Sequence, residues 1–261
     1  MMEFAYVLPG ALVGFLVGLT GVGGGSLMAP ILILMLGFQP AVAVGTDLWF
    51  AAITKTAGGY VHRQVGSPNW KLAGLLAVGS VPAAILTLIW LGASKGGRLE
   101  ADLLMRLLGA MLLLTAAVTP MKEKLRAPLT VLRKRMGPML RPGQRIFTIM
   151  GAACIGCLVT LTSVGAGALI AVMLMLLYPL RLDTKTIVGT DIVHAIPLAL
   201  IAAIGHSLFG NVDWHLLGWL LLGSIPGIIV GSLVTGRINE SWVRIALSLM
   251  LALSGIKLLF A

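Results

Sequence analysis

The chain has 261 residues, of which 58% are hydrophobic and 11% charged, whereas a soluble domain carries about a quarter charged residues. This composition excludes a water-soluble fold, and apolar runs recur from end to end, so we expect one all-α polytopic membrane protein. The net charge of +10 does not predict a nucleic-acid partner, because eight of the 19 basic residues fall between residues 121 and 145. Membrane lipid is the expected surrounding partner.

The first segment is too long to be a single membrane span. Residues 4–46 contain no Asp, Glu, Lys or Arg, and as one helix they would extend about 65 Å, twice the roughly 30 Å hydrocarbon core. The segment must therefore turn back, and glycine weakens helix most strongly in one run. The turn is expected at Thr20, Gly21, Gly23, Gly24, Gly25 and Ser26. No Lys or Arg precedes the apolar run, so a cleaved signal peptide is not expected.

Three further spans and a basic stretch follow. The apolar pattern predicts spans at residues 48–61, 72–91 and 103–119. Residues 121–145 are interpreted as a basic cytoplasmic linker between a first membrane repeat, residues 1–120, and a second, residues 146–261. A basic amphipathic helix that grips anionic lipid headgroups is an equal alternative for the same stretch.

The second half repeats the first. Val-Gly-Thr-Asp at residues 44–47 recurs at 188–191, and Gly-Ser-Val-Pro at 79–82 recurs as Gly-Ser-Ile-Pro at 223–226. Residues 146–180 form a second uncharged stretch too long for one span. It is expected to turn back at Thr162, Ser163, Gly165 and Gly167, and spans are expected at residues 187–208, 214–235 and 242–260.

The orientation of the two copies follows from the number of crossings. If each glycine-broken hairpin enters and leaves on one face, each copy crosses an odd number of times and the copies are inverted. That topology places 14 Lys and Arg residues inside and only Lys95 and Arg98 outside, whereas uninterrupted spans would give 10 and 6. The positive-inside rule favours the first arrangement. We predict two inverted repeats, each a Gly-broken helical hairpin followed by three transmembrane helices, with both termini periplasmic.

The glycine turns suit an anion. Unpaired amide groups at a half-helix start, together with the helix dipole, attract negative charge, and hydroxyl groups add donors. The alternative is that the glycines only allow close helix packing. The predicted substrate-binding residues are Thr20, Gly21, Gly23, Gly24, Gly25, Ser26, Thr46, Lys55, Thr162, Ser163, Gly165, Gly167 and Thr190. No metal site and no cofactor are expected.

Four ionisable residues within the spans are candidates for a role in transport. Lys55 lies deep in its predicted helix, where a cation should neutralise an anion or pair with Asp47. Asp47 and Asp191 exchange a proton during transport, or they simply occupy the first helical turn after N-caps at the preceding threonines. His194 shares a helix face with Asp191 and is the third candidate for coupling.

The remaining His and Cys residues receive simpler interpretations. His62 and His206 are expected at the membrane interface, at loop edges. Cys154 and Cys157 form a C-x-x-C pair without the context of a redox or metal site. We expect small buried thiols between helices, with contact to a sulfur-containing substrate as a minor alternative.

The order of these motifs resembles that of a known family. The run from Gly18 to Pro30 with its glycine cluster, then Val44-Gly45-Thr46, then the same order in the second half, is similar to the TauE/SafE family of sulfite and organosulfonate exporters. The resemblance implies a bacterial inner-membrane permease for sulfite, sulfoacetate or related sulfur oxyanions, without an organic cofactor. One departure, Ala166 and Ala168 within the second glycine run, predicts two unequal half-sites.

The expected function is thus a secondary transporter, an exporter of a small anion, which works by alternating access with its site at the two turns. An intramembrane enzyme using Asp191, His194 and the cysteine pair is the alternative from another class, and a passive anion channel is the third. The motifs are repeated in the second half, but the candidate catalytic residues are not repeated at matched positions. This favours a transporter over an enzyme. A homo-oligomer is left open.

Overall fold

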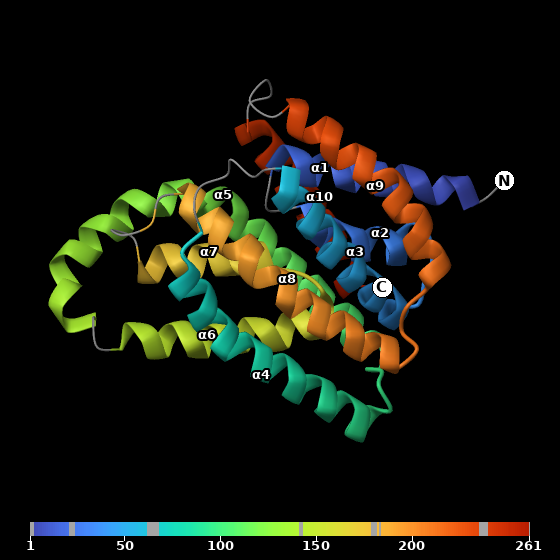
Figure 1. The fold of residues 1–261 in the computed structure, drawn as a ribbon, viewed down its shortest axis with the longest axis horizontal. Coiled ribbons are helices and arrows are strands. Elements are labelled where there is room, and N and C mark those ends of the chain that lie inside the picture. Colours follow the sequence, from blue (N-terminus) through green and yellow to red (C-terminus); the bar gives the residue numbers. More distant parts are fainter. Residues whose placement is uncertain are drawn as a thin grey trace.

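The computed structural model describes residues 3–20, 24–61, 68–140, 143–178, 182, 184–234 and 240–260, and no strand occurs in these ranges. The first half contains two short 3₁₀ helices, η1 and η2, and five α-helices (Figure 1). They are η1 (Glu3–Tyr6), α1 (Val7–Thr20), η2 (Gly24–Leu27), α2 (Met28–Leu34), α3 (Pro40–Val61), α4 (Trp70–Lys95) and α5 (Ala101–Leu140). The second half contains α6 (Gln144–Thr162), α7 (Ala166–Leu177), α8 (Thr184–Leu208), α9 (Trp214–Val234) and α10 (Glu240–Leu259).

Six helical segments in the described ranges are long and apolar enough to cross a membrane. They are Trp70–Lys95, Ala101–Pro120, Gln144–Thr162, Thr186–Leu208, Trp214–Val234 and Trp242–Leu259. Helices of 18 residues or more span the hydrocarbon core because each residue adds about 1.5 Å. The prediction of an all-α polytopic membrane protein is therefore confirmed.

Both long uncharged segments are interrupted where glycine clusters. In the second half, α6 ends at Thr162 and α7 begins at Ala166. Ser163 and Gly165 between them have left-handed backbone conformations, with φ of 58° and 94°, which end a helix because the hydrogen-bond ladder cannot continue. Figure 1 shows α7 running back along α6. In the first half, α1 ends at Thr20 and η2 begins at Gly24.

Two helix starts differ from the predictions. α3 begins at Pro40 rather than at residue 48, and α8 begins at Thr184 rather than at residue 187. Proline suits the first position of a helix, where its missing N–H group would have no partner. The stretch before Asp47 is therefore already helical.

The helices of the two halves interleave. α1 packs against α9 of the second half, and α6 packs correspondingly against α4 of the first. These contacts need glycine: a Cβ atom on Gly14 would lie 2.3 Å from the carbonyl oxygen of Ser224, and one on Gly156 would lie 2.6 Å from that of Ser80. The two contacts occupy corresponding places in the two repeats.

The centre of the molecule is formed by α3 with α8, which run in opposite directions in Figure 1. Two hydrogen bonds join their threonines to the other half. The backbone N–H of Asp213 donates to Thr46 Oγ1 at 3.0 Å, and that of Asn69 donates to Thr190 Oγ1 at 3.0 Å. Thr46 therefore joins the start of α9 to α3, and Thr190 joins the start of α4 to α8.

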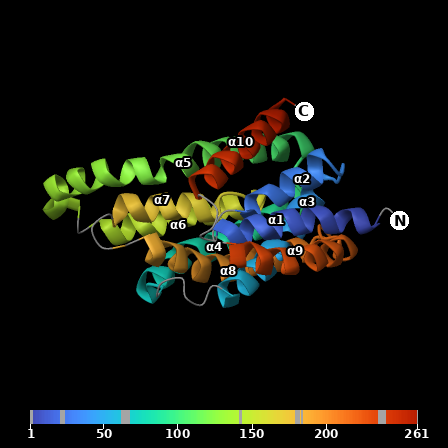
Figure 2. The same ribbon diagram turned by 90° about the horizontal axis from the view of Figure 1, so that it is seen from above.

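The outer helices lie on two sides. Figure 2 shows α5 crossing α10 on one side and α9 on the other, with α1 between them. α5 continues as helix to Leu140, so the backbone of most of the basic stretch is helical. This agrees with the helical alternative for residues 121–145.

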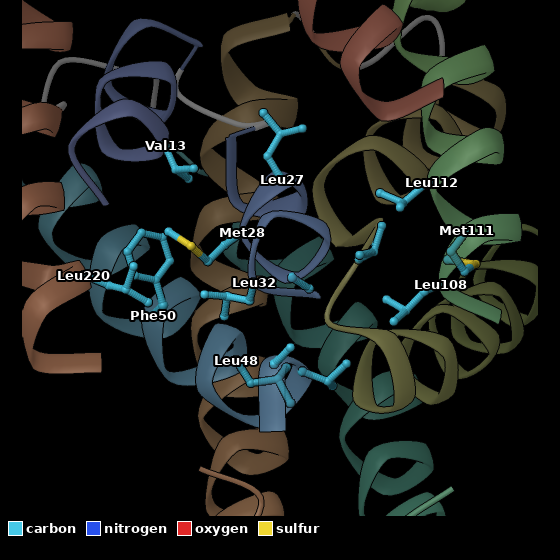
Figure 3. Close-up of a cluster of buried hydrophobic side chains, with 14 of the residues drawn as sticks. Val13, Leu27, Met28, Leu32, Leu48, Phe50, Leu108, Met111, Leu112 and Leu220 are labelled. Carbon is cyan, nitrogen blue, oxygen red and sulfur yellow. The ribbon is translucent and has the colours of Figure 1, made fainter. Parts of the chain in front are cut away.

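The apolar core lies where the first-half hairpin meets α3 and α5. Figure 3 shows Met28, Leu32, Leu48 and Phe50 turned toward one another, and all four are at most 1% exposed. In a membrane protein such side chains stabilise the fold mainly by close packing, because lipid tails are as apolar as the core. The core fixes the position of α3, which carries the charged residues of the candidate site.

Candidate functional site

A cavity of about 30 Å³ lies between α3, α8 and the two interrupted segments. α3 contributes Leu48, Ala51 and Lys55, α8 contributes Ala195 and Ala199, and the 3₁₀ helix η2 contributes Ser26. The rest of the lining is Val159 of α6, Ser163 between α6 and α7, and Ala166 and Gly167 at the start of α7. The cavity thus receives residues from both repeats, and four of the predicted binding residues meet there: Ser26, Lys55, Ser163 and Gly167.

The start of α7 forms the polar wall of this cavity. Ala166 and Gly167 are the first residues of that 12-residue helix, so their backbone N–H groups have no partner within the helix. The Ser163 hydroxyl is buried beside them without a hydrogen-bond partner among the described residues. Unpaired amide groups, a free hydroxyl and the positive end of a helix dipole together suit an anion.

Lys55 supplies the positive charge. Its side chain is half-buried and lines the cavity from α3, opposite the start of α7. Apolar side chains form most of the remaining wall, and in such surroundings an unbalanced cation favours a bound counter-ion. The small volume suits a compact anion, since it holds roughly two water molecules.

Asp47 lies in the interior of α3 and is not in a first helical turn, because that helix starts at Pro40. The N-cap alternative for Thr46 and Asp47 is therefore wrong. The Asp47 side chain is 0% exposed, and within the described ranges neither carboxylate oxygen has a hydrogen-bond partner. The Ser163 side chain, the Ala29 backbone amide and the Lys55 charge are its polar neighbours.

Asp191 occupies the corresponding position in α8. It is also 0% exposed, without a partner for either oxygen in the part of the chain that the structure describes. The N-cap alternative fails here too, because α8 starts at Thr184. His194, one turn further, is 1% exposed, and its Nε2 atom shares a 2.7 Å hydrogen bond with Ser80 Oγ. Asp191 acts on His194 electrostatically, but neither Asp191 oxygen nor His194 Nδ1 has a hydrogen-bond partner among the described residues.

Three threonines predicted to bind substrate do not line the cavity. Thr46 and Thr190 accept the loop amides described above. Thr162 donates to the carbonyl oxygen of Leu158 at 2.7 Å and accepts from the Val164 N–H at 3.3 Å, which closes the end of α6. Gly165 turns the chain between α6 and α7 with its left-handed backbone and is not part of the lining either.

The first-half turn is described only in part. Gly21 and Gly23 lie outside the described residues. The backbone places Thr20 at the end of α1, and Gly24 and Gly25 at the start of η2. Ser26 is the residue by which this turn reaches the cavity.

Two interpretations of single residues are wrong. His206 is not interfacial: it is 4% exposed, and its Nε2 atom lies 2.9 Å from the carbonyl oxygen of Thr160. Cys154 is exposed and Cys157 half-buried, so the first is no buried thiol between helices. His62 lies outside the described residues. The described ranges contain no group of three or more His, Cys, Asp or Glu residues placed to hold a metal ion.

Sequence reasoning missed Ser80 and the alanines of the cavity wall. Ser80 stands in the repeated Gly-Ser-Val-Pro motif, and the repetition was the signal that could have pointed to it. Its role becomes visible only in the hydrogen bond to His194. Ala51 and Ala195 occupy equivalent positions in the two repeats and both line the cavity. Alanine has no reactive group, so only the repeat alignment could have pointed to them.

Comparison with known proteins identifies the family of the chain. Residues 6–258 match the family described as Sulfite exporter TauE/SafE. The chain is 37% identical to the "Probable membrane transporter protein YjnA" of Bacillus subtilis (strain 168), over 99% of this chain and 100% of that protein. It is 30% identical to the "Probable membrane transporter protein YdhB" of the same organism, over 95% and 97%. No solved structure matches the chain significantly. The chain belongs to the sulfite exporter TauE/SafE family and is a multi-pass membrane transporter.

Proposed function

We propose that the protein is a secondary transporter that exports a small sulfur oxyanion, sulfite or an organosulfonate, across the bacterial inner membrane. One observation carries the proposal: the Lys55 ammonium, the free Ser163 hydroxyl and the start of α7 meet in one small cavity between the repeats. Each of these groups stabilises negative charge, and none of them requires a chemical reaction.

The proposed transport cycle uses two inverted repeats. The opposite directions of α3 and α8 support this relation. The contact of α1 with α9, which matches that of α6 with α4, supports it as well. The cavity contains Ala51 with its equivalent Ala195, so the two central helices contribute to it alike. Rocking of the packed helices about such a position would open the cavity to one side of the membrane at a time.

Reconstituted protein provides the test. Liposomes containing the purified chain should release radiolabelled sulfite or methanesulfonate at a rate that saturates with anion concentration. Lys55→Ala, which copies the alanine found at position 199, should lower the flux at least tenfold because the cavity loses its cation. Lys71→Ala removes an exposed cation from α4 and should leave the flux near that of the wild type.

Several results would contradict the proposal. Absence of flux for every sulfur oxyanion would remove its basis, and a Lys55→Ala variant with normal flux would show that the anion binds elsewhere. An ohmic conductance without saturation would indicate a channel instead. Recovery of a product that differs chemically from the added anion would indicate an enzyme.

A further inference from the structure

We propose that Asp47 is a proton-binding site, and that its protonation and the binding of the anion in the cavity favour each other, so that one proton crosses with each anion. This inference rests on the proposed function and adds the coupling ion. It starts from the position of Asp47 on α3 relative to Lys55.

Asp47 lies on the face of α3 that lines the cavity. Ala51 and Lys55 follow it at intervals of four residues, and both line the cavity. Residues at this spacing lie above one another on a helix, and side chains lean toward the helix N-terminus. The Lys55 side chain therefore leans toward the end of α3 that carries Asp47, and the two charges act on each other.

The surroundings of Asp47 make its charge costly. The carboxyl group is completely buried, and no described donor meets the distance and angle of a full hydrogen bond with either oxygen. The Ser163 side chain and the Ala29 backbone amide lie near it, but an ionised carboxylate buried inside a membrane protein stays unfavourable unless a cation compensates for it. Among the described side chains, Lys55 is the cation that acts on Asp47, and the same cation faces the anion.

Competition for Lys55 links the proton to the anion. When the cavity is empty, Lys55 can compensate for an ionised Asp47. When an anion occupies the cavity, it repels an ionised Asp47 and attracts the ammonium to itself, so the carboxylate gains a proton. The linkage is reciprocal, because protonation of Asp47 must strengthen anion binding by the same factor.

Other titratable groups near α3 have other partners or lie on other helices. Among the described side chains, α1 and α2 contribute none. α5 also packs against α3 and carries Asp102 and Arg106 among its described side chains. Of the other helices that pack against α3, α8 carries Asp191, His194 and His206 among its described side chains, and α9 carries His215. Of these, His194 is bonded to Ser80 and His206 lies against Thr160.

Asp191 provides a matched control. It is as deeply buried as Asp47 and equally without hydrogen-bond partners among the described residues. Eight residues further along its helix, however, stands Ala199 where the first repeat has Lys55. Only the first repeat therefore has a lysine at this spacing from its buried carboxylate, and we assign coupling to Asp47 alone.

Transport of methanesulfonate tests the assignment, since this compact organosulfonate keeps a single negative charge at all relevant pH values. Wild-type protein in liposomes should move one proton with each anion, measured by an entrapped pH dye, and the flux should not respond to a membrane potential set with potassium and valinomycin. Asp47→Asn should carry the anion without the proton, so its flux becomes potential-dependent. Asp191→Asn should keep the wild-type proton-to-anion ratio.

An Asp47→Asn variant that retains the wild-type ratio would overturn the inference. If neither sulfite nor methanesulfonate is transported by the wild type, the proposed function fails, and infrared spectroscopy then decides about Asp47 separately. The difference spectrum between the wild type and Asp47→Asn should contain the carbonyl band of a buried protonated carboxylic acid, and this band should remain in Asp191→Asn. Identical spectra of the wild type and Asp47→Asn across the acidic to neutral range would overturn the proton site.

Discussion

Single glycines determine how closely the helices approach. A Cβ atom on Gly79 would lie 2.2 Å from the carbonyl oxygen of Ile149, whereas one on Gly74, on the same helix, would meet nothing within 4 Å among the described residues. Gly79→Ala should therefore destabilise the protein by about 1–3 kcal/mol through overpacking. Gly74→Ala should be neutral or slightly stabilising, since alanine favours helix. Thermal unfolding followed by circular dichroism measures both, and equal melting temperatures would contradict the contact.

The buried pair of Ser80 and His194 gives a second prediction at this scale. Their hydrogen bond is 2.7 Å long, and the other ring nitrogen of His194 has no partner in the described ranges. Ser80→Ala leaves the imidazole without that hydrogen bond and should cost about 1–3 kcal/mol. Ser94→Ala on the exposed side of the same helix removes only a bond to the Trp90 carbonyl one turn earlier. It should change the free energy of unfolding by less than about 0.5 kcal/mol.

Polar and charged residues were the part of the candidate site that the sequence could predict. Lys55 and Ser163 carry groups that an anion needs, and their places in a span and a glycine turn predicted an anion-binding role. The fold brings both to one cavity, and the role itself stays a prediction. Asp47 was harder to place, because Gly-Thr-Asp also fits a helix start and only the fold shows that α3 begins earlier, at Pro40. The contact of Ser80 with His194 joins two helices far apart in sequence, which no local pattern encodes.

At the scale of the element, α4 and α9 start in the same way. Asn69 Oδ1 accepts a hydrogen bond from the Leu72 N–H at 3.1 Å, and Asp213 Oδ1 accepts one from the Leu216 N–H at 2.9 Å. Asp213→Ala should lower stability by about 0.5–2 kcal/mol, whereas Asp213→Asn keeps a capping oxygen and should lose much less. Chemical unfolding measures the stability of both variants. If the charge of Asp213 is required, and not only its capping oxygen, both variants should be equally unstable.

Element boundaries were predictable where the chain itself interrupts the helix. The left-handed Ser163 and Gly165 lie where the glycine run predicted a turn. The interval between α2 and α3 has a weaker signal, a single glycine, Gly37, with φ of 70°, followed by Pro40. The surrounding apolar residues concealed it, so the end of α2 at Leu34 and the new start at Pro40 were not predicted.

For the whole molecule, the distribution of basic residues predicts its orientation. In a background without the two cysteines, Arg133→Cys should be protected from a membrane-impermeant thiol reagent added to intact cells, because the proposed topology places the basic stretch in the cytoplasm. Lys95→Cys, beside the exposed turn after α4, should be labelled from outside. The reverse labelling pattern would overturn the proposed topology, since the positive-inside rule would then be violated.

Interleaving of the halves has a consequence for biogenesis. α1 is made well before its packing partner α9, which can insert only after the intervening helices. Until then the glycine surface of α1 has only lipid beside it, and lipid offers it no such close fit. The amino-terminal part of the chain therefore waits in an incomplete state, and a nascent chain that stalls before α9 leaves an unfinished protein that quality-control proteases can recognise.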